Sequence, residues 1–236
     1  MIKVGITGNT GFLGQHLSQA ITSDNELSLI PFSKEMFLQQ KNFNRFVNQI
    51  DCLVHLAAVQ RDQEENLLKQ NLLLTNTVIN SLKNSGKHLI FASSIQENIN
   101  SAYGRSKKQS RELFIEAAQK YDFAFSGLIL PNVFGPGAKP ETTSVVATFC
   151  DAIAKKMPTK IIVDKKISFI YVDDLIKQII SIIKNRSTFS SYVVQPETKI
   201  SVKELLNILE QLDSGKKPEN SFEEKLNFTL NWYSNN

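Results

Sequence analysis

Three glycines follow the first β-branched run of the chain at steps of three residues. The run covers residues 2–6, the glycines are Gly8, Gly11 and Gly14, and a helical pattern over 12–21 begins inside the same loop. Glycine permits a tight turn, close packing of helix against strand, and the approach of a pyrophosphate to N–H groups at a helix N-terminus. Such a turn directly after a first strand predicts a dinucleotide site.

Short apolar runs alternate with longer amphipathic segments over the first half of the chain. Strands are expected at 2–6, 27–31, 52–56, 88–92 and 124–130, and helices at 12–21, 64–82 and 103–121. The expected strands are apolar nearly throughout, as strands buried on both faces are. This alternation predicts an α/β fold, a Rossmann-type doubly wound parallel sheet with helices on both faces.

The pattern changes after Pro131, where proline and glycine become frequent. Helices are expected at 143–155, 173–184 and 201–212, short strands near 161–163, 167–171 and 192–194, and a last amphipathic stretch at 222–232. We therefore expect a dinucleotide-binding Rossmann domain over 1–131. A small mixed substrate-binding portion over 132–236 is expected to be interleaved with it and unable to fold alone.

Composition excludes several classes of protein. The chain has 42% hydrophobic and 21% charged residues and a net charge of +4, with basic residues scattered rather than interleaved with aromatics, so no nucleic-acid partner is expected. Two cysteines and no cluster at metal-ligand spacing predict neither a disulfide framework nor a metal site. The N-terminus does not read as a signal peptide and no apolar run has membrane-spanning length, so we expect a cytoplasmic protein without a membrane partner.

The end of the second expected strand bears on which dinucleotide binds. An acid at this place would hold the adenosine ribose hydroxyls of NAD. The chain has Ser33 and Lys34 there, and no acid before Glu35. A serine and a lysine can accept a 2′-phosphate, so the sequence favours NADP(H) and leaves NAD(H) open.

A tyrosine and a lysine four residues apart suit acid–base chemistry. Tyr103 and Lys107 lie on one face of the expected helix, and a nearby ammonium stabilises a phenolate and lowers the pKa of a tyrosine from its usual value of about 10. The same ammonium can hold ribose hydroxyls of the nicotinamide. Ser94 ends the fourth expected strand, where its hydroxyl can orient a substrate oxygen against Tyr103.

Together these motifs resemble the extended short-chain dehydrogenase/reductases, the NAD-dependent epimerase/dehydratase family. The matching pieces are TGNTGFLG at 7–14, HLAA at 55–58, Asn71, FASS at 91–94, YGRSK at 103–107, PNVFGP at 131–136 and YVDD at 171–174. The resemblance implies that Ser94, Tyr103 and Lys107 are catalytic. The dinucleotide site it implies comprises Gly8, Thr10, Gly11, Phe12, Leu13, Gly14, Ser33, Lys34, Leu56, Ala57, Ala58, Asn71, Tyr103, Lys107, Pro131 and Val133. The implied substrate site comprises Ser94, Ile95, Gln96 and Asn132.

The segments at 93–96, 131–135 and 144–150 are similar to one subgroup, bacterial reductases of capsule and O-antigen synthesis. These reduce a UDP-2-acetamido-2,6-dideoxy-hexos-4-ulose on the route to UDP-N-acetyl-L-fucosamine and carry a C-terminal cupin domain. This chain shows no histidine-rich cupin segment, which implies a lone reductase domain or a shorter relative. It departs from the family at Leu128–Leu130, where an arginine usually precedes the proline, and at Lys165 and Lys166, where an arginine often meets the substrate phosphates.

The same residues serve more than one reaction. The leading expectation is reduction of the C4 ketone of a nucleotide-activated, UDP-linked 4-keto-6-deoxy-hexosamine in surface polysaccharide synthesis. A 4-epimerase with retained NAD would use the same catalytic residues, and a non-catalytic dinucleotide-binding sensor is a third hypothesis. A 4,6-dehydratase needs an Asp-Glu pair just after the serine, and the chain has only Glu97 nearby. The family likeness also implies a homodimer formed through two helices, those over 64–82 and 103–121.

Overall fold

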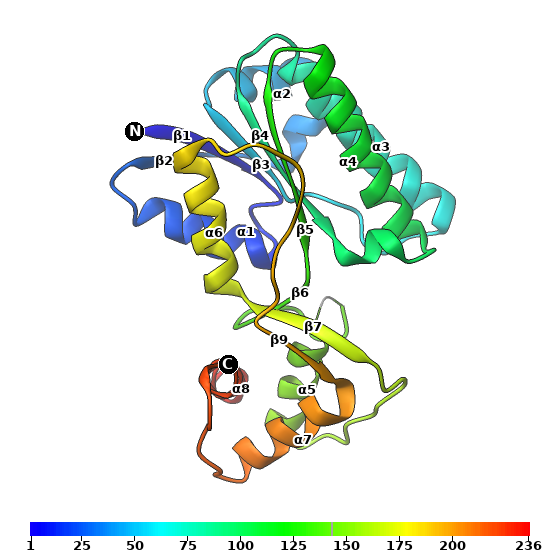
Figure 1. Ribbon diagram of the computed structural model, residues 1–236, viewed down its shortest axis with the longest axis vertical. Helices are drawn as coiled ribbons and strands as arrows, with labels where there is room; N and C mark the ends of the chain where they lie inside the picture. The colour runs from blue at the N-terminus through cyan, green and yellow to red at the C-terminus, as the bar shows by residue number, and fades with distance from the viewer. Residues whose placement is uncertain (143) are drawn as a thin grey trace. The chain divides into compact units, whose positions relative to one another are not determined.

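The structure is a computed structural model that describes residues 1–142 and 144–236. The chain divides into two units. The first joins Met1–Leu130 to Ile176–Val194, and the second joins Pro131–Leu175 to Gln195–Asn236 (Figure 1).

The first unit is built on a six-stranded sheet in the order β2-β1-β3-β4-β5-β8, with every neighbouring pair parallel. Its strands are β1 (Ile2–Thr7), β2 (Leu27–Ile30), β3 (Cys52–His55), β4 (His88–Ser94), β5 (Ala124–Leu130) and β8 (Phe189–Val193). Thr7 pairs with His55, and His55 with Phe91, so β1 and β3 end at one edge of the sheet and β4 runs three residues further. This confirms the predicted α/β fold with a doubly wound parallel sheet.

Helices cover both faces of this sheet (Figure 1). Helices α1 (Phe12–Thr22) and α6 (Val172–Asn185) lie on one face, and α2 (Gln40–Asn48), α3 (Glu64–Leu82) and α4 (Ala102–Lys120) on the other. Two short 3₁₀ turns, η1 (Lys34–Leu38) and η2 (Ile95–Asn98), follow β2 and β4. On the first face, the Lys184 ammonium of α6 pairs with Asp24 and Glu26, just before β2.

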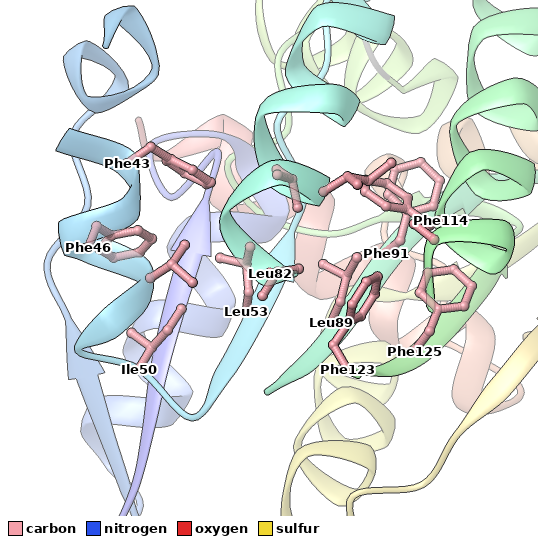
Figure 2. Packing of buried hydrophobic residues seen from close by; sticks show 14 of the residues in the cluster. Phe43, Phe46, Ile50, Leu53, Leu82, Leu89, Phe91, Phe114, Phe123 and Phe125 are labelled. Atoms are coloured by element: carbon pink, nitrogen blue, oxygen red, sulfur yellow. The ribbon is translucent and has the colours of Figure 1, made fainter. Parts of the chain in front are cut away.

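An aromatic core lies between the sheet and the second face of helices (Figure 2). Phe43 and Phe46 enter it from α2, Phe91 from β4, Phe114 from α4 and Phe125 from β5, and each is almost fully buried. Burial of such side chains contributes about 1.5–3 kcal/mol each relative to exposure. The core therefore fixes α4 against β4 and β5, and α4 carries two of the predicted catalytic residues.

Among its described residues, the second unit holds a three-stranded sheet, three complete helices and the first turn of α6. Strands β6 (Asn132–Phe134), β7 (Lys166–Tyr171) and β9 (Thr198–Ser201) lie in the order β6-β7-β9, with β6 parallel and β9 antiparallel to β7. The helices are α5 (Val145–Ala154), α7 (Val202–Asp213) and α8 (Ser221–Ser234). A capping box of Ser201 and Glu204 begins α7. The small mixed portion expected after residue 131 is therefore present.

Some sequence expectations differ from the structure, and strands β6 and β9 were not expected. The strand expected at 161–163 is wrong, because the run forms no ladder and Ile162 is 88% exposed. Residues 176–194 were expected in the smaller portion, but most of α6 and all of β8 complete the first unit, since β8 pairs with β5 across a long sequence separation. Helix α2 was not expected, because most of its residues are polar and only Phe43, Phe46 and Val47 form its buried apolar face. The expected start of α5, Thr143, lies outside the described residues.

Candidate active site

A buried hydrogen bond joins the ends of the first and third strands. Thr7 Oγ1 lies 2.6 Å from His55 Nδ1, and the Leu56 N–H donates to the Thr7 carbonyl at 3.1 Å. Burial lowers the pKa of His55 to about 3, with a further lowering from the Lys107 charge, so the ring is neutral at physiological pH. His55 therefore helps to fix the point where the glycine loop leaves β1.

The glycine loop fits a dinucleotide in its close packing. A Cβ on Gly14 would lie 2.1 Å from the Gly8 carbonyl oxygen, and one on Gly8 would lie 2.8 Å from the Ala57 nitrogen. Gly8 also has φ of +78°, a conformation that glycine adopts without strain. These contacts hold the loop directly against residues 56–58, and only glycine fits at Gly8 and Gly14.

The first turn of α1 is open to an anion. Its N-cap, Gly11, provides no side-chain cap, and no acidic residue lies in this turn. The unpaired N–H groups and the helix dipole there suit a pyrophosphate. Around this turn, Thr10 and Gly11 are exposed and Phe12 and Leu13 half-buried. The loop as a whole thus fits the nicotinamide dinucleotide that the sequence predicts.

Asn71 on α3 supports the loop that follows β3. Its side-chain oxygen accepts from the Val59 N–H at 2.7 Å, and its amide nitrogen donates to the Val59 carbonyl at 2.9 Å and to Ser106 at 3.1 Å. Asn71 is only 5% exposed. Leu56, Ala57 and Ala58 are half-buried ahead of this anchor. Its amide is thus occupied in shaping the loop that carries the predicted cofactor residues.

The turn after β2 carries charges of both signs. Ser33 and Lys34 are exposed, as a 2′-phosphate site requires. Glu35 lies beside them, and its own backbone N–H, then the Ser33 hydroxyl and the Lys34 charge, hold the pKa of its carboxyl below the usual value. The Ser33 hydroxyl therefore already donates to an acid. Lys34 and Glu35 therefore present an ammonium and a carboxylate side by side at the turn where the sequence predicts the adenosine ribose.

Ser94 is the last residue of β4 and the N-cap of η2. Its Oγ accepts a hydrogen bond from the Gln96 N–H at 3.2 Å, and its side chain is half-buried. The next two predicted substrate residues, Ile95 and Gln96, form the first turn of η2, half-buried and exposed respectively. The serine hydroxyl is thus held at the carboxyl end of the sheet, where parallel α/β folds bind ligands.

Tyr103 and Lys107 lie one turn apart on α4. The Lys107 ammonium is 5.8 Å from the centre of the Tyr103 ring, 4.8 Å from that of Phe91, and donates to the Ala92 carbonyl at 2.7 Å. Burial lowers the pKa of Lys107 to about 8 and raises that of Tyr103 to about 12. The pKa of Tyr103 is thus dominated by burial, whereas the sequence led us to expect a lowering by the lysine.

Three predicted site residues belong to the second unit. Pro131 is buried, while Asn132 and Val133 begin β6 half-buried. Asn132 donates its side-chain amide to the Ser168 carbonyl at 3.3 Å, which ties β6 to β7. The first unit, by contrast, gathers the glycine loop, residues 56–58, Ser94, Tyr103 and Lys107 around the ends of β1, β3 and β4. The part of the chain that the structure describes contains no group of three metal-ligating side chains and no helix able to cross a bilayer.

Known proteins match this arrangement in sequence and in fold. A family model described as the NAD dependent epimerase/dehydratase family matches residues 4–194. The UDP-2-acetamido-2,6-beta-L-arabino-hexul-4-ose reductase of Pseudomonas aeruginosa is 29% identical over 221 residues, which are 92% of this chain and 59% of that protein.

Two solved structures share the fold. The capsular polysaccharide assembling protein CapF from Staphylococcus aureus superposes with a TM-score of 0.79 at 25% identity, over 98% of this chain and 65% of that one. RMD from Pseudomonas aeruginosa, solved with NADPH, gives a TM-score of 0.85 at 16% identity, over 100% of this chain and 99% of that one. The chain thus spans about three fifths of the length of the Pseudomonas reductase and slightly more of CapF.

Proposed function

Because the chain belongs to the NAD-dependent epimerase/dehydratase family, whose model matches residues 4–194, we propose that it reduces the C4 ketone of a UDP-activated 4-keto-6-deoxy-hexosamine. The observation that carries the proposal is the convergence of three groups on the end of β4. Lys107 is bonded to the Ala92 carbonyl, two residues before Ser94, and lies one helical turn from Tyr103. The match to a 4-keto sugar reductase over 92% of the chain supports this choice of reaction.

Each residue has a role in the proposed reduction. A bound nicotinamide supplies the hydride. Ser94 Oγ donates a hydrogen bond to the keto oxygen and orients it. Tyr103 transfers its phenolic proton to that oxygen as the alkoxide forms, and the Lys107 ammonium stabilises the resulting phenolate across the helix face. The close backbone packing at Gly8 and Gly14 shapes the loop so that a pyrophosphate can approach the N–H groups at the start of α1.

We extend the proposal to the setting of the reaction. The Pseudomonas relative is named for a UDP sugar and CapF for capsular polysaccharide assembly, which supports a role in bacterial surface polysaccharide synthesis in the cytoplasm. A homodimer through the outer faces of α3 and α4 is supported by Leu73, which is 65% exposed on α3. Light scattering of the purified protein tests the dimer, and Leu73→Glu should yield monomers.

A 4-epimerase with retained NAD is the second candidate, and one observation favours it. The Glu35 carboxylate, beside Ser33, suits the free ribose hydroxyls of NAD. An epimerase returns the hydride, so it consumes no dinucleotide in net terms. A non-catalytic sensor would bind the dinucleotide and convert no sugar. No feature of the geometry at Ser94, Tyr103 and Lys107 specifically favours this alternative.

The deciding experiment is a single-turnover assay with the purified chain. The protein is loaded with NADPH, mixed with a UDP-4-keto-6-deoxy-N-acetylhexosamine, and followed by nicotinamide fluorescence and by mass spectrometry of the sugar. Stoichiometric NADPH oxidation with a two-hydrogen gain in the sugar supports the reductase. A parallel sample loaded with NAD⁺ and given a UDP-N-acetylhexosamine tests the epimerase, which would interconvert the C4 epimers without net formation of NADH. Binding of the dinucleotide without turnover of either sugar would support the sensor.

A further inference from the structure

A buried ion pair lies directly behind the turn that carries Ser94. Arg111 on α4 donates two hydrogen bonds to the Glu97 carboxylate, from Nη2 to Oε1 at 2.8 Å and from Nε to Oε2 at 3.1 Å. The two side chains are only 13% and 4% exposed. A bidentate pair of this kind fixes both distance and orientation, and removal of either partner leaves an uncompensated buried charge.

The same carboxylate also reaches the end of β4. Ser93 Oγ donates to Glu97 Oε2 at 2.6 Å. Ser93, Glu97 and Arg111 therefore form one buried network that joins the strand end, the η2 turn and helix α4. Both carboxylate oxygens of Glu97 accept hydrogen bonds within this network, so Glu97 is not placed to act as the acid or base of a dehydratase.

Helix α4 presents its functional residues along one stripe. Tyr103, Lys107 and Arg111 recur at steps of four, so they lie on one side of the helix over about 12 Å. Lys107 bonds the Ala92 carbonyl of β4, and Arg111 bonds Glu97 of η2. The segment with Ser94 thus lies along the stripe that carries the proposed proton donor.

The backbone of η2 also packs closely against helix α4 at Gly104. A Cβ on Gly104 would lie 2.2 Å from the Gln96 carbonyl oxygen and 2.5 Å from that of Ile99. The backbone of η2 therefore rests on the first turn of α4, next to Tyr103. Packing at Gly104 and the ion pair at Arg111 hold this turn at two points.

We propose that Glu97 and Arg111 are positioning residues that hold Ser94 in register with Tyr103 for proton transfer. This inference rests on the proposed function. Neither residue touches the reacting atoms, and the pair acts through the η2 backbone. A misplacement of about 1 Å at a reacting group costs roughly a hundredfold in rate, so loss of the pair should appear in kcat.

The test compares Arg111→Met with three controls. Arg111→Met should lower kcat roughly ten- to a hundredfold and leave the Kd for NADPH within about twofold. Arg111→Lys keeps the charge and one hydrogen bond, so it should retain most of kcat. Arg105 lies on the same helix as Arg111 and pairs with the exposed Glu64 of α3. Glu64→Gln removes this exposed ion pair and should leave kcat unchanged. Leu82→Ala creates a buried cavity and should lower the melting temperature without lowering kcat.

A double-mutant cycle separates positioning from plain destabilisation. If the pair acts through Ser94, Arg111→Met should cost roughly nothing further in kcat once Ser94→Ala is in place. Full additivity of the two losses, or an unchanged kcat in an Arg111→Met protein with a lowered melting temperature, would overturn the proposal.

Hydrogen exchange at residues 95–99 tests the positioning role of the ion pair independently of the proposed function. Arg111→Met should accelerate exchange in this turn relative to Leu82→Ala. Wild-type protein that reduces no sugar would refute the proposed function, while faster exchange would still show that the pair fixes the turn. Unchanged exchange in an active enzyme would refute the positioning role alone.

Discussion

The Lys107 ammonium lies 5.8 Å from the centre of the Tyr103 ring while it donates a 2.7 Å hydrogen bond to the Ala92 carbonyl. In this arrangement the lysine is bonded to the strand that ends in Ser94 and is buried beside the half-buried tyrosine, in a setting that disfavours charge. Burial lowers the pKa of Lys107 and raises that of Tyr103, which keeps the phenol protonated as a proton donor requires.

Substitution of Tyr103 by phenylalanine should remove the proton donor and little else. We expect kcat for sugar reduction to fall by roughly 10²–10⁴-fold, the usual contribution of general acid catalysis. The Kd for NADPH should stay within about threefold, measured by fluorescence titration. Tyr121→Phe at the end of the same helix is the matched control and should retain wild-type turnover. Turnover that persists in Tyr103→Phe would assign the proton donor elsewhere.

Lys107→Met should stabilise the protein while it abolishes turnover. A buried lysine whose pKa falls from 10.5 to about 8 costs the folded state about 3 kcal/mol at neutral pH, partly offset by its hydrogen bond to Ala92. Between pH 8 and pH 10.5 the unfolded chain holds the proton that the folded chain has lost, so stability rises with pH in this window.

Urea unfolding at a series of pH values tests this prediction. The gain of Lys107→Met over wild type should be largest at pH 7 and should shrink as the pH rises from 8 to 10.5. Lys108→Met, an exposed neighbour, should show neither the gain nor the pH dependence. A Lys107→Met protein less stable than wild type at pH 7 would contradict the assigned cost of burial.

Gly14→Ala should break the dinucleotide site through backbone packing. The new Cβ would lie 2.1 Å from the Gly8 carbonyl oxygen and 2.6 Å from the Asn9 Cα, so the loop must shift. We expect a loss of more than about 2 kcal/mol in unfolding free energy and at least a tenfold weaker NADPH affinity. Gly11→Ala, whose Cβ would lie 3.2 Å from the Gly8 carbonyl, should cost clearly less stability in the same urea titration.

Charge changes after β2 should shift the choice between dinucleotides. Lys34→Gln removes the cation expected to meet a 2′-phosphate, so the ratio of NADPH to NADH affinity should fall roughly tenfold, which corresponds to about 1.4 kcal/mol. Glu35→Gln removes the competing carboxylate and frees the Ser33 hydroxyl, so the ratio should rise. Paired fluorescence titrations with both dinucleotides measure this ratio. A ratio unmoved by either change would place the ribose of the dinucleotide elsewhere.

Local sequence was enough to predict most of the first unit. Helix α3 and strand β5 begin and end at the expected residues, because apolar periodicity and the flanking polar residues are local signals. The family was confirmed for the same reason, since its motifs are contiguous runs that fold at strand ends. The roles of the individual site residues remain predictions.

The exposed run at Ile162 and Val163 shows the limit of such signals. Its β-branched residues suggest a strand, yet no partner strand lies beside it in the described chain, and propensity alone makes no ladder. Strand β8 shows a second limit. A short strand was expected near 192–194, but only its pairing with the distant strand β5 places it in the first sheet.

The sequence by itself determined the fold class and the family, and it predicted the chemistry at Gly8, Ser94, Tyr103 and Lys107. Tertiary structure alone decided that Glu97, which lies in sequence near the place of a dehydratase acid, bonds to Arg111 fourteen residues away in the chain. It also decided that burial rather than the neighbouring charge governs the pKa of Tyr103. Periodicity and motifs depend on neighbours along the chain, whereas ion pairing and desolvation depend on distances in space that only the packed chain creates.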